Sequence, residues 1–404
     1  MNSSEFSYFK SSSRPILDLG IQPVSNRFLP SSGLEAPKFP LQLNLNLDTG
    51  LVYIDNPFPV EELKPRYDWL TCFEPEDHLD ALVQKLIALP GIARDSVFGA
   101  YSFKDDSTLQ RLQNLGYAKN WRIHPEQDLG IVDPCASIET YQAAFTPVRA
   151  QQIRERYGPA DVLIVRHVIE HSYNLPLFLD AMRSLIKPDG YIVWELPDCE
   201  GALAAGDCTT IWEEHIFYFT SFTFKLLLQS AGFSIVSYES FPYPLENSIV
   251  AIVREAKGEK NTVEPDTASL QREIERAHRF ADAVAHRRQI IRDKLEKFRE
   301  KVGGIALFGA GHLSVAFLSI LGVYDLIDFV IDDNPHKKGM RMPVGNLEIR
   351  GSDALYSGAI KLCLLGLNPH NQPKVVAKHG EFEAQGGLFA SIFPGSDLDL
   401  EKIL

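Results

Sequence analysis

The segment from Trp212 to Thr220 brings together three side chains that can move or hold a proton. Glu214 has a carboxyl group, His215 an imidazole and Tyr218 a phenol. Histidine needs little tuning to accept a proton near neutral pH, and a neighbouring carboxylate can fix its tautomer. We therefore predict His215 as a general base supported by Glu214, with Tyr218 beside them. The alternative is a structural histidine at the start of a helix, hydrogen-bonded to the backbone.

A second group of polar side chains follows the apolar run in ADVLIVRHVIEH. Arg166 and His167 end this run, Glu170 and His171 come directly after it, and Glu195 stands in the next apolar run, YIVWELP. In open α/β sheets a ligand binds beyond the carboxyl ends of the strands. We expect Arg166 and His167 to contact a cofactor at this edge, and Glu195 to contact the substrate.

The sequence VFGAYS reads as a strand that enters a loop. Gly99 permits a close approach of a ligand to the backbone, while Ser102, Asp105 and Asp106 offer oxygens to a ribose or an ammonium group. The next predicted strand, NWRIHP, has His124 where an acid would bind a ribose. A plainer interpretation of the hydroxyl side chains after Asp106 is that they cap the following helix.

The sequence GIALFGAGHLSVAF predicts a second strand that turns into a helix through glycines. Such a turn, here with Gly309 and Gly311, offers backbone N–H groups and a helix N-terminus to a phosphate. Asp332 ends the next predicted strand, where an acid often contacts a ribose. The third glycine of the dinucleotide fingerprint is absent, so the turn is expected to bind part of a nucleotide-linked substrate, or no nucleotide at all.

Composition and charge narrow the class of protein. The 404 residues carry a formal net charge of −13, which opposes sequence-independent binding to nucleic acid or to an anionic membrane. The five cysteines include no C-x-x-C pair, and the N-terminus has no apolar signal region. We expect a cytoplasmic protein with reduced thiols, a small-molecule substrate and no metal; the oligomeric state stays open.

The elements that position these residues alternate between apolar strands and amphipathic helices. Such alternation predicts an α/β fold with mostly parallel sheets covered on both faces, and antiparallel closure by the last two strands of the central part. Leucines at every second position from Leu41 to Leu47 predict a half-buried strand in a β-rich N-terminal module. The expected parts are a small β-rich module (1–70), a Rossmann-like domain (71–257), a linker with a helix (258–302) and a second, smaller Rossmann-like domain (303–404).

The helix expected between the two Rossmann-like domains carries one narrow apolar stripe. Apolar residues recur at steps of three and four from Leu270 to Val302, with Arg288 as an interruption. We interpret it as a helix that bridges two domains. A self-associating coiled coil is the alternative.

Several motifs along the chain together resemble those of one family. LDLGIQPVSNRFL is similar to that family's L-D-L-G-x-Q-P-x-x-N-x-F, Trp212 to Thr220 to its Y-H-E-H-x-x-Y-F-S, and DFVIDDNPHKKG to its D-x-x-P-x-K-x-G. The family is the three-part sugar C-methyltransferases of deoxysugar and surface-polysaccharide biosynthesis. These have an N-terminal zinc-binding domain, a class I methyltransferase domain and a C-terminal Rossmann-like domain.

The resemblance implies an S-adenosylmethionine-dependent enzyme that methylates carbon on a nucleotide-linked keto-deoxysugar. A base, His215 here, would remove a proton next to a carbonyl, and the enolate would take the methyl group. The family's H-G-G-S loop near the sugar nucleotide falls on Leu245 to Ser248, which makes Asn247 an expected substrate contact.

The chain departs from the family at several motifs. One pair of zinc cysteines falls on Asn46 and Thr49, and the other, expected near residues 5–13, is missing, so the module is expected to fold without metal. The family's Tyr-His pair becomes Trp212-Glu213. An alternative function is therefore a catalytically inactive methyltransferase-like binding protein that partners a sugar-modifying enzyme. An oxidoreductase is disfavoured because no Tyr-Lys or Cys constellation accompanies the glycine turn.

Overall fold

The leucines at every second position form the buried face of a strand, as the sequence predicts, but Asn44 and Asn46 on its other face are buried as well. The computed structural model describes residues 12–70, 74–257 and 263–404. In it, Leu41, Leu43 and Leu45 are buried along β2 (Lys38–Asn46), which pairs with β1 (Ser13–Pro23) and β3 (Val52–Ile54). The fourth strand of this sheet is β8 (Phe217–Tyr218), which comes from the predicted catalytic segment. Pairing of Val52 with Tyr218 thus fixes that segment to the N-terminal module.

The central sheet has six strands, and its apolar runs are buried on both faces. Val162 and Ile164 of one strand join the core on one face, whereas Leu163 and Val165 join the core on the other. The order is β5 (Asn120–Arg122), β4 (Phe98–Ala100), β6 (Ala160–Arg166), β7 (Ile186–Asp198), β10 (Asn247–Glu255) and β9 (Phe233–Phe241). The first four strands are parallel and β10 is antiparallel to both of its neighbours, so the predicted antiparallel closure is confirmed.

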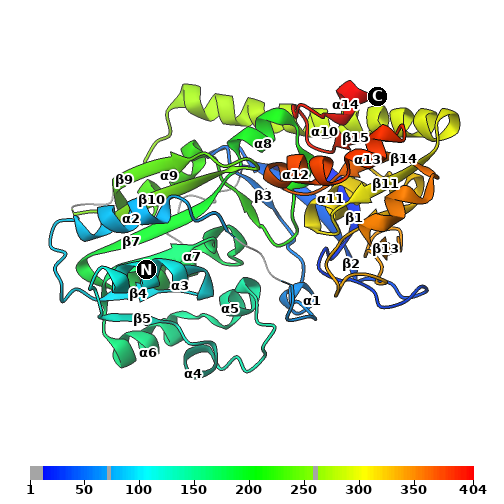
Figure 1. Cartoon of the computed structure of the whole chain (residues 1–404). Helices are drawn as coiled ribbons and strands as arrows, with labels where there is room; N and C mark the ends of the chain where they lie inside the picture. Colours follow the sequence, from blue (N-terminus) through cyan, green and yellow to red (C-terminus); the bar gives the residue numbers. More distant parts are fainter. Residues whose placement is uncertain (1–11, 71–73, 258–262) are drawn as a thin grey trace.

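Helices cover both faces of this sheet (Figure 1). They are α2 (Leu79–Ile87), α3 (Asp106–Asn114), α4 (Pro125–Leu129), α5 (Ile138–Ala144), α6 (Pro147–Tyr157), α7 (Leu175–Ser184), α8 (Glu200–Ala205) and α9 (Ser221–Ser230), with short turns η2 (Phe103–Asp105), η3 (Ile169–His171) and η4 (Cys208–Thr210); α1 (Val60–Leu63) precedes them. The Lys187–Gly190 segment, whose residue types favour a turn after α7, is part of β7 instead. A register irregularity between Ala160 and Val162 accommodates it.

The C-terminal domain contains a parallel five-stranded sheet, which confirms the second Rossmann-like unit. Its order is β13 (Ile349–Arg350), β12 (Phe329–Ile331), β11 (Gly304–Phe308), β14 (Ile360–Leu365) and β15 (Leu388–Ser391). The helices are α11 (His312–Ile320), α12 (Gln372–Lys378), α13 (Gly380–Ala384) and α14 (Leu400–Ile403). The glycine turn lies between β11 and α11, as the sequence predicts.

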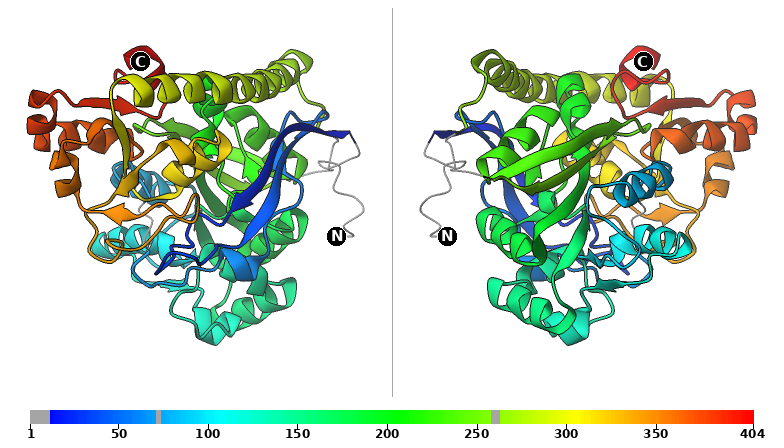
Figure 2. Two further views of the ribbon diagram at one scale, coloured as in Figure 1. Left: turned by 90° about the vertical axis from the view of Figure 1, so that its right-hand side faces the viewer. Right: turned by 90° about the vertical axis from the view of Figure 1, so that its left-hand side faces the viewer.

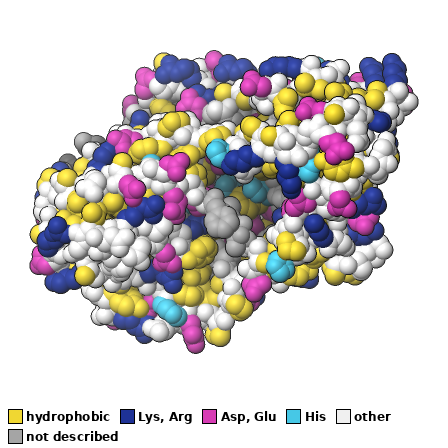
Figure 3. Space-filling view, viewed as in Figure 1, with side chains coloured by type: hydrophobic (Ala, Val, Ile, Leu, Met, Phe, Trp, Pro, Cys, Tyr) yellow, Lys and Arg dark blue, Asp and Glu magenta, His cyan; other side chains and the backbone are white. Residues whose placement is uncertain are grey.

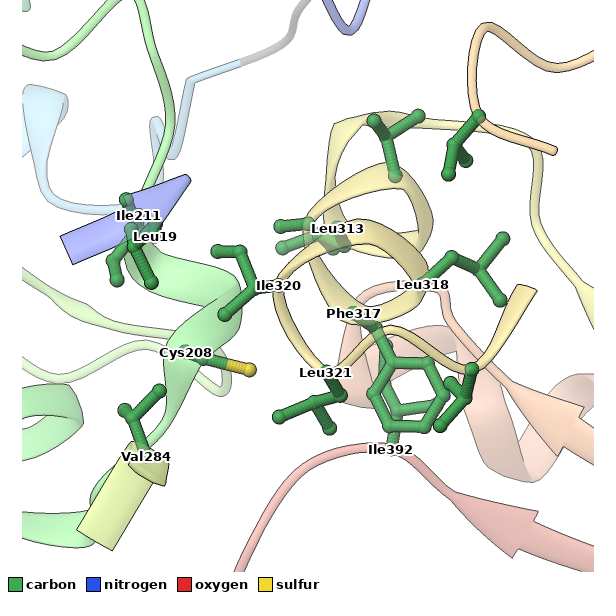
Figure 4. Packing of buried hydrophobic residues seen from close by; sticks show 14 of the residues in the cluster. Leu19, Cys208, Ile211, Val284, Leu313, Phe317, Leu318, Ile320, Leu321 and Ile392 are labelled. Carbon is green, nitrogen blue, oxygen red and sulfur yellow. The ribbon is translucent and has the colours of Figure 1, made fainter. Parts of the chain in front are cut away.

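The long helix α10 (Thr267–Lys301) crosses the top of the molecule and packs on all three parts (Figure 2). Its buried stripe, which includes Phe280 and Val284, shares one apolar cluster with Leu19 of the N-terminal module and Phe317 of α11. Figure 4 shows Val284 and Cys208 beside the apolar face of α11. These contacts support the bridging interpretation. Among the described residues, no helix is long and apolar enough to span a membrane.

Candidate active site

Two cavities meet where the carboxyl ends of the central strands face the C-terminal domain. The larger has a volume of about 730 Å³ and the smaller about 350 Å³. Glu74, Glu76, Trp212 and His312 line both, so they form the wall between the two. Histidine side chains are visible in a hollow at this place in Figure 3. The central strands and the C-terminal glycine turn therefore contribute to one composite site.

His215 lies at the boundary of the two cavities. Its ring centroid is 4.7 Å from that of His171 and 4.9 Å from that of Trp212, and its side chain lines the smaller cavity. Burial, together with the neighbouring His171 and Lys104, lowers the pKa of His215 well below its ordinary value. The imidazole is thus neutral at neutral pH and has a lone pair to accept a proton.

Glu214 lines the larger cavity and differs in charge from what the sequence suggests. Asn26 Nδ2 donates a hydrogen bond to Glu214 Oε1 at 3.1 Å. Burial, with the nearby carboxylates of Glu139 and Glu213, raises the pKa of Glu214 well above its ordinary value. These surroundings favour the neutral carboxylic acid form of Glu214, which can donate a hydrogen bond, over an ionised partner of His215.

Tyr218 has a structural position instead of a place in either cavity. Its side chain is 1 % exposed, and its hydroxyl is 3.2 Å from both the backbone nitrogen and the backbone oxygen of Trp212. The expected catalytic contact is corrected: Tyr218 holds the backbone of Trp212, three residues before His215, and does not face the cavities.

A buried charge network replaces the expected ligand contacts of Arg166 and Glu195. Arg166 Nε donates to Glu195 Oε2 at 2.5 Å, and Arg166 Nη1 and Nη2 donate to the backbone oxygens of Lys104 and Pro75 at 2.7 and 3.0 Å. Glu195 is fully buried and lines neither cavity, so the predicted substrate contact is wrong. Arg166 reaches the larger cavity, but its donors are engaged within the protein. His167 lines the smaller cavity and not the larger one.

The loop after β4 is closed by its own hydrogen bonds. Asp105 accepts hydrogen bonds from the backbone nitrogens of Tyr101, Ser102 and Arg166 at 3.0, 2.9 and 3.0 Å. Ser102 caps η2, and both Ser102 and Asp105 are fully buried. Their predicted cofactor contacts are therefore corrected, because their oxygens serve the loop itself.

Gly99 and His124 also have local roles. A Cβ at Gly99 would lie 2.5 Å from the Trp121 ring, so glycine is required here for close packing of an indole rather than of a ligand. His124 Nδ1 accepts a hydrogen bond from Gln127 N at 3.3 Å and caps α4, and it lines neither cavity. Of the predicted cofactor residues of this loop region, Asp106 does line the larger cavity, where it pairs with Arg122 at 2.5 Å.

The larger cavity nevertheless has groups suited to a cationic cofactor. Burial alone raises the pKa of Glu74, but His167 and Lys104 outweigh it and hold that pKa at about 2, so Glu74 is an anion. Glu139, at the start of α5, faces the same cavity. Neither residue was singled out from the sequence; Glu139 stands in no motif, and Glu74 follows a segment outside the described residues.

The C-terminal turn contributes Gly311 and His312, but not Asp332, to the site. Gly311 lines the larger cavity, while Gly309 (φ 105°) packs against the Gly366 carbonyl. Asp332 accepts hydrogen bonds from Ala310 N at 3.1 Å and Asn334 N at 2.9 Å, and it pairs with Lys337. Asp332 therefore stabilises the turn and lines neither cavity, and its ribose contact stays a prediction.

The loop before β10 presents a different residue from the one predicted. Asn247 is exposed, begins β10 opposite Asp198 and lines neither cavity. Its neighbour Glu246 lines the smaller cavity, where burial raises its pKa to about 8. The predicted loop thus lies at the site, but Glu246 and not Asn247 lines the cavity.

The positions of one expected cysteine pair form a hydrogen-bonded turn. Asn46 Oδ1 accepts hydrogen bonds from the backbone nitrogens of Asp48 and Thr49 at 2.9 and 3.1 Å, and Thr49 Oγ1 accepts one from Leu51 N at 3.3 Å. Polar side chains thereby hold the connection between β2 and β3. The region of the other pair, residues 5–13, lies mainly outside the described residues.

Comparisons with known proteins agree with this architecture. Residues 109–238 match the model of a methyltransferase domain, and residues 253–394 match that of a C-methyltransferase C-terminal domain, which takes in α10. The chain is 26 % identical over 282 residues to the C-methyltransferase NovU of Streptomyces niveus, covering 67 % of this chain and 66 %, just under two thirds, of the relative.

Solved structures share only a part of the chain. A Burkholderia thailandensis 1,6-didemethyltoxoflavin-N1-methyltransferase is 13 % identical. The match covers 45 % of this chain and 78 % of that protein's chain, with a TM-score of 0.30. YcgJ of a Bacillus species is 7 % identical. The match covers 45 % of this chain and 100 % of the YcgJ chain, with a TM-score of 0.31. By the family models, the central unit contains a methyltransferase domain and is followed by a C-methyltransferase-type C-terminal domain.

Proposed function

We propose that the protein is an S-adenosylmethionine-dependent C-methyltransferase that acts on a nucleotide-linked keto-deoxysugar. The observation that carries this proposal is the position of His215, a neutral imidazole at the boundary of two cavities. A methyl donor and an acceptor that bind on the two sides of this boundary meet beside a proton acceptor. The match to the C-methyltransferase C-terminal domain and the likeness to NovU support transfer to carbon.

The cofactor is assigned to the side of the larger cavity formed by the loops after β4 and before α5. Lys104, Ser107 and the backbone from Pro134 to Ser137 line this side. S-adenosylmethionine supplies an electrophilic methyl group when bound. The anionic Glu74 and the carboxyl group of Glu139 fit its positive charges, and the cavity volume of about 730 Å³ exceeds what the cofactor alone needs.

The nucleotide part of the substrate is assigned to the opposite side of the larger cavity. There the N-terminal module contributes Phe28 and Tyr67, whose rings suit a base, and the C-terminal domain contributes Gly311 and Lys337. The backbone at the N-terminus of α11 favours a diphosphate. From this position the sugar reaches the smaller cavity past Trp212.

His215 and Glu214 then divide the proton chemistry between them. His215 accepts the proton from the carbon next to the carbonyl, and the electron pair of that C–H bond forms the enolate. Glu214, protonated near pH 7, donates a hydrogen bond to the enolate oxygen, in the manner of a buried carboxylic acid kept neutral by its surroundings. Trp212, stacked on His312, shields the reacting carbon from water.

Solvent exchange tests this proposal directly. The protein with a nucleotide-linked keto-deoxysugar in D₂O is expected to exchange the proton next to the carbonyl, and with S-adenosylmethionine to give a product with a new C-methyl signal in the NMR spectrum. The matching substrate with the carbonyl reduced to an alcohol is the control and should neither exchange nor react. Methylation of oxygen, or methylation without exchange, would refute the proposed mechanism.

The closed loop after β4 motivates the second candidate, a binding protein without catalytic activity. Its carboxylate, Asp105, accepts hydrogen bonds from three backbone nitrogens instead of facing a ligand. Titration calorimetry separates the two candidates: the enzyme binds S-adenosylmethionine, whereas no heat of binding at millimolar cofactor favours the binding protein.

A further inference from the structure

We propose that Glu170, His171 and His215 form a binding site for one divalent transition-metal cation. One carboxylate oxygen and one ring nitrogen from each histidine lie within 4.8 Å of one another. Ligands around a bound Zn²⁺ at bonds of about 2.0–2.2 Å lie roughly 3–4 Å apart, so small side-chain rotations close the site. Two imidazoles and one carboxylate are a common donor set for Zn²⁺, Co²⁺ and Fe²⁺.

The Glu170 carboxylate provides an independent indication of a ligand. Glu170 is 2 % exposed, and among the described residues neither of its oxygens has a hydrogen-bond partner. Burial of a carboxylate without a hydrogen bond is costly, and a bound cation normally relieves that cost. Its own backbone is held firmly, because Ile216 N donates to Glu170 O at 2.7 Å. A cation between Glu170 and the two histidines would satisfy this side chain.

A second carboxylate orients His171 for coordination. His171 Nδ1 lies 2.6 Å from Glu139 Oε1, which leaves Nε2 free, and Nε2 lies 3.9 Å from Glu170 Oε1. Histidine ligands of metals nearly always direct their other ring nitrogen to a carboxylate, a carbonyl or water in this way. His167 Nδ1 lies 3.7 Å from Glu170 Oε1 and helps to position this carboxylate, the third ligand.

The cluster is also accessible and lies in a negative field. His171 lines the larger cavity, and Glu170 and His215 line the smaller, so a cation can enter from either side. The ionised Glu74 faces the same space and supplies this field, whereas Glu246, with a pKa of about 8, is protonated near pH 7. Three protein ligands leave coordination positions open toward the cavities, as in metal sites that exchange with solvent.

The consequence rests on the proposed function. Coordination uses the lone pair of His215 with which we propose it accepts the substrate proton, so metal occupancy and turnover exclude each other. The cluster thus has a metal-free, active form and a metal-bound, inactive form. This proposal differs from the sequence-based expectation that the chain holds no metal.

Cobalt titration tests the site without reference to catalysis. Protein stripped with a chelator is titrated with CoCl₂ and followed by visible absorption and by the melting temperature. We expect a band that saturates at one Co²⁺ per chain and a rise in melting temperature. Glu170→Gln and His171→Ala should abolish the band, and Glu139→Gln should weaken binding about 10- to 100-fold, the usual effect of removing such a supporting partner.

The control is Glu76→Gln, because Glu76 lines both cavities but lies outside the cluster and pairs with Arg111. It should bind Co²⁺ like the wild type. No band with the wild type, or an unchanged band in folded His171→Ala protein, overturns the site. Methylation assayed in metal-free protein keeps the two proposals apart: failure there counts against the proposed function alone, and stimulation by Co²⁺ overturns the exclusion.

Discussion

Trp212 and His312 stack face to face across the two large domains. Their ring centroids are 4.3 Å apart and their planes differ by 15°. Burial lowers the pKa of His312 to about 4, so a neutral ring meets the indole. Both side chains line both cavities. One aromatic contact therefore couples the position of α11 to the wall beside His215.

Replacing Trp212 by alanine should weaken both the domain contact and the site. An aromatic pair contributes about 0.5–1.5 kcal/mol beyond its buried area, so the melting temperature should fall. The KM for the sugar nucleotide should rise as well, because α11 loses its fixed position. Trp212→Phe keeps a stacked ring and should lie close to the wild type in thermal unfolding and steady-state kinetics. Equal effects of the two variants would contradict a role of stacking.

Replacing His215 by alanine should abolish turnover and leave cofactor affinity nearly unchanged. General base catalysis contributes about 10²- to 10⁴-fold, and kcat should fall by this range in metal-free protein. Rapid-quench kinetics and calorimetry with S-adenosylmethionine measure the two quantities. His370→Ala is the matched control, since His370 is an exposed histidine on the wall of the same smaller cavity. Unchanged turnover in His215→Ala would contradict its assignment as the base.

The fold was predictable from the sequence where burial alone decides the structure. The run from Val162 to Val165 is apolar at every position and packs on both faces, and such a run indicates a buried parallel strand. Period-two leucines likewise predicted β2. The Lys187–Gly190 segment is a strand for a tertiary reason, because pairing of Ile186 with Ala160 extends β7 through a sequence whose local preference is a turn.

The site was predictable to the level of the segment but not of the side chain. His215 and Glu214 lie where the motif indicated. Asp105 instead accepts hydrogen bonds within its own loop and from Arg166 N, and Glu195 accepts one from the Arg166 side chain. Sequence spacing shows which strand end a residue follows; it does not show whether a distant backbone nitrogen or arginine already occupies its oxygens. Glu139 was missed for the converse reason, since tertiary packing alone brings it to His171.

Replacing Gly99 by alanine should destabilise the fold rather than weaken cofactor binding selectively. The new Cβ would lie 2.5 Å from Trp121, and overpacking of this kind costs about 1–3 kcal/mol. Urea denaturation measures the loss. Gly201→Ala is the control, because a Cβ there meets open space in α8 and should cost nothing. A stable Gly99→Ala protein with reduced affinity for S-adenosylmethionine would return Gly99 to the cofactor site.

Replacing Asn46 by alanine should loosen the connection between β2 and β3. Two backbone donors, Asp48 N and Thr49 N, lose their acceptor, at a net cost of about 1 kcal/mol per hydrogen bond. Asn46→Asp keeps an oxygen in the same place and should retain most of the stability. Both variants are compared by thermal unfolding. If alanine and aspartate are equally destabilising, the turn does not depend on the side-chain acceptor.

Replacing Glu195 by glutamine should lower stability at neutral pH and flatten its dependence on acid. Burial alone raises the pKa of Glu195, but hydrogen bonds from His167 and His78 and the charge of Arg166 outweigh it and hold the pKa well below the ordinary 4.5. A carboxyl group whose pKa is depressed by folding stabilises the protein above its unfolded pKa, and this contribution is lost as pH falls through the folded pKa. Glu195→Gln should therefore cost about 3 kcal/mol at pH 7, the lower end for a broken buried ion pair, and the difference from wild type should shrink below about pH 4.5. Urea denaturation at several pH values measures it.

Ser248→Ala, which removes an uncharged donor 3.1 Å from Glu195 Oε1, should cost about 1 kcal/mol with little pH dependence; a wild-type–glutamine difference that stays constant into acid would contradict the ionised state of Glu195.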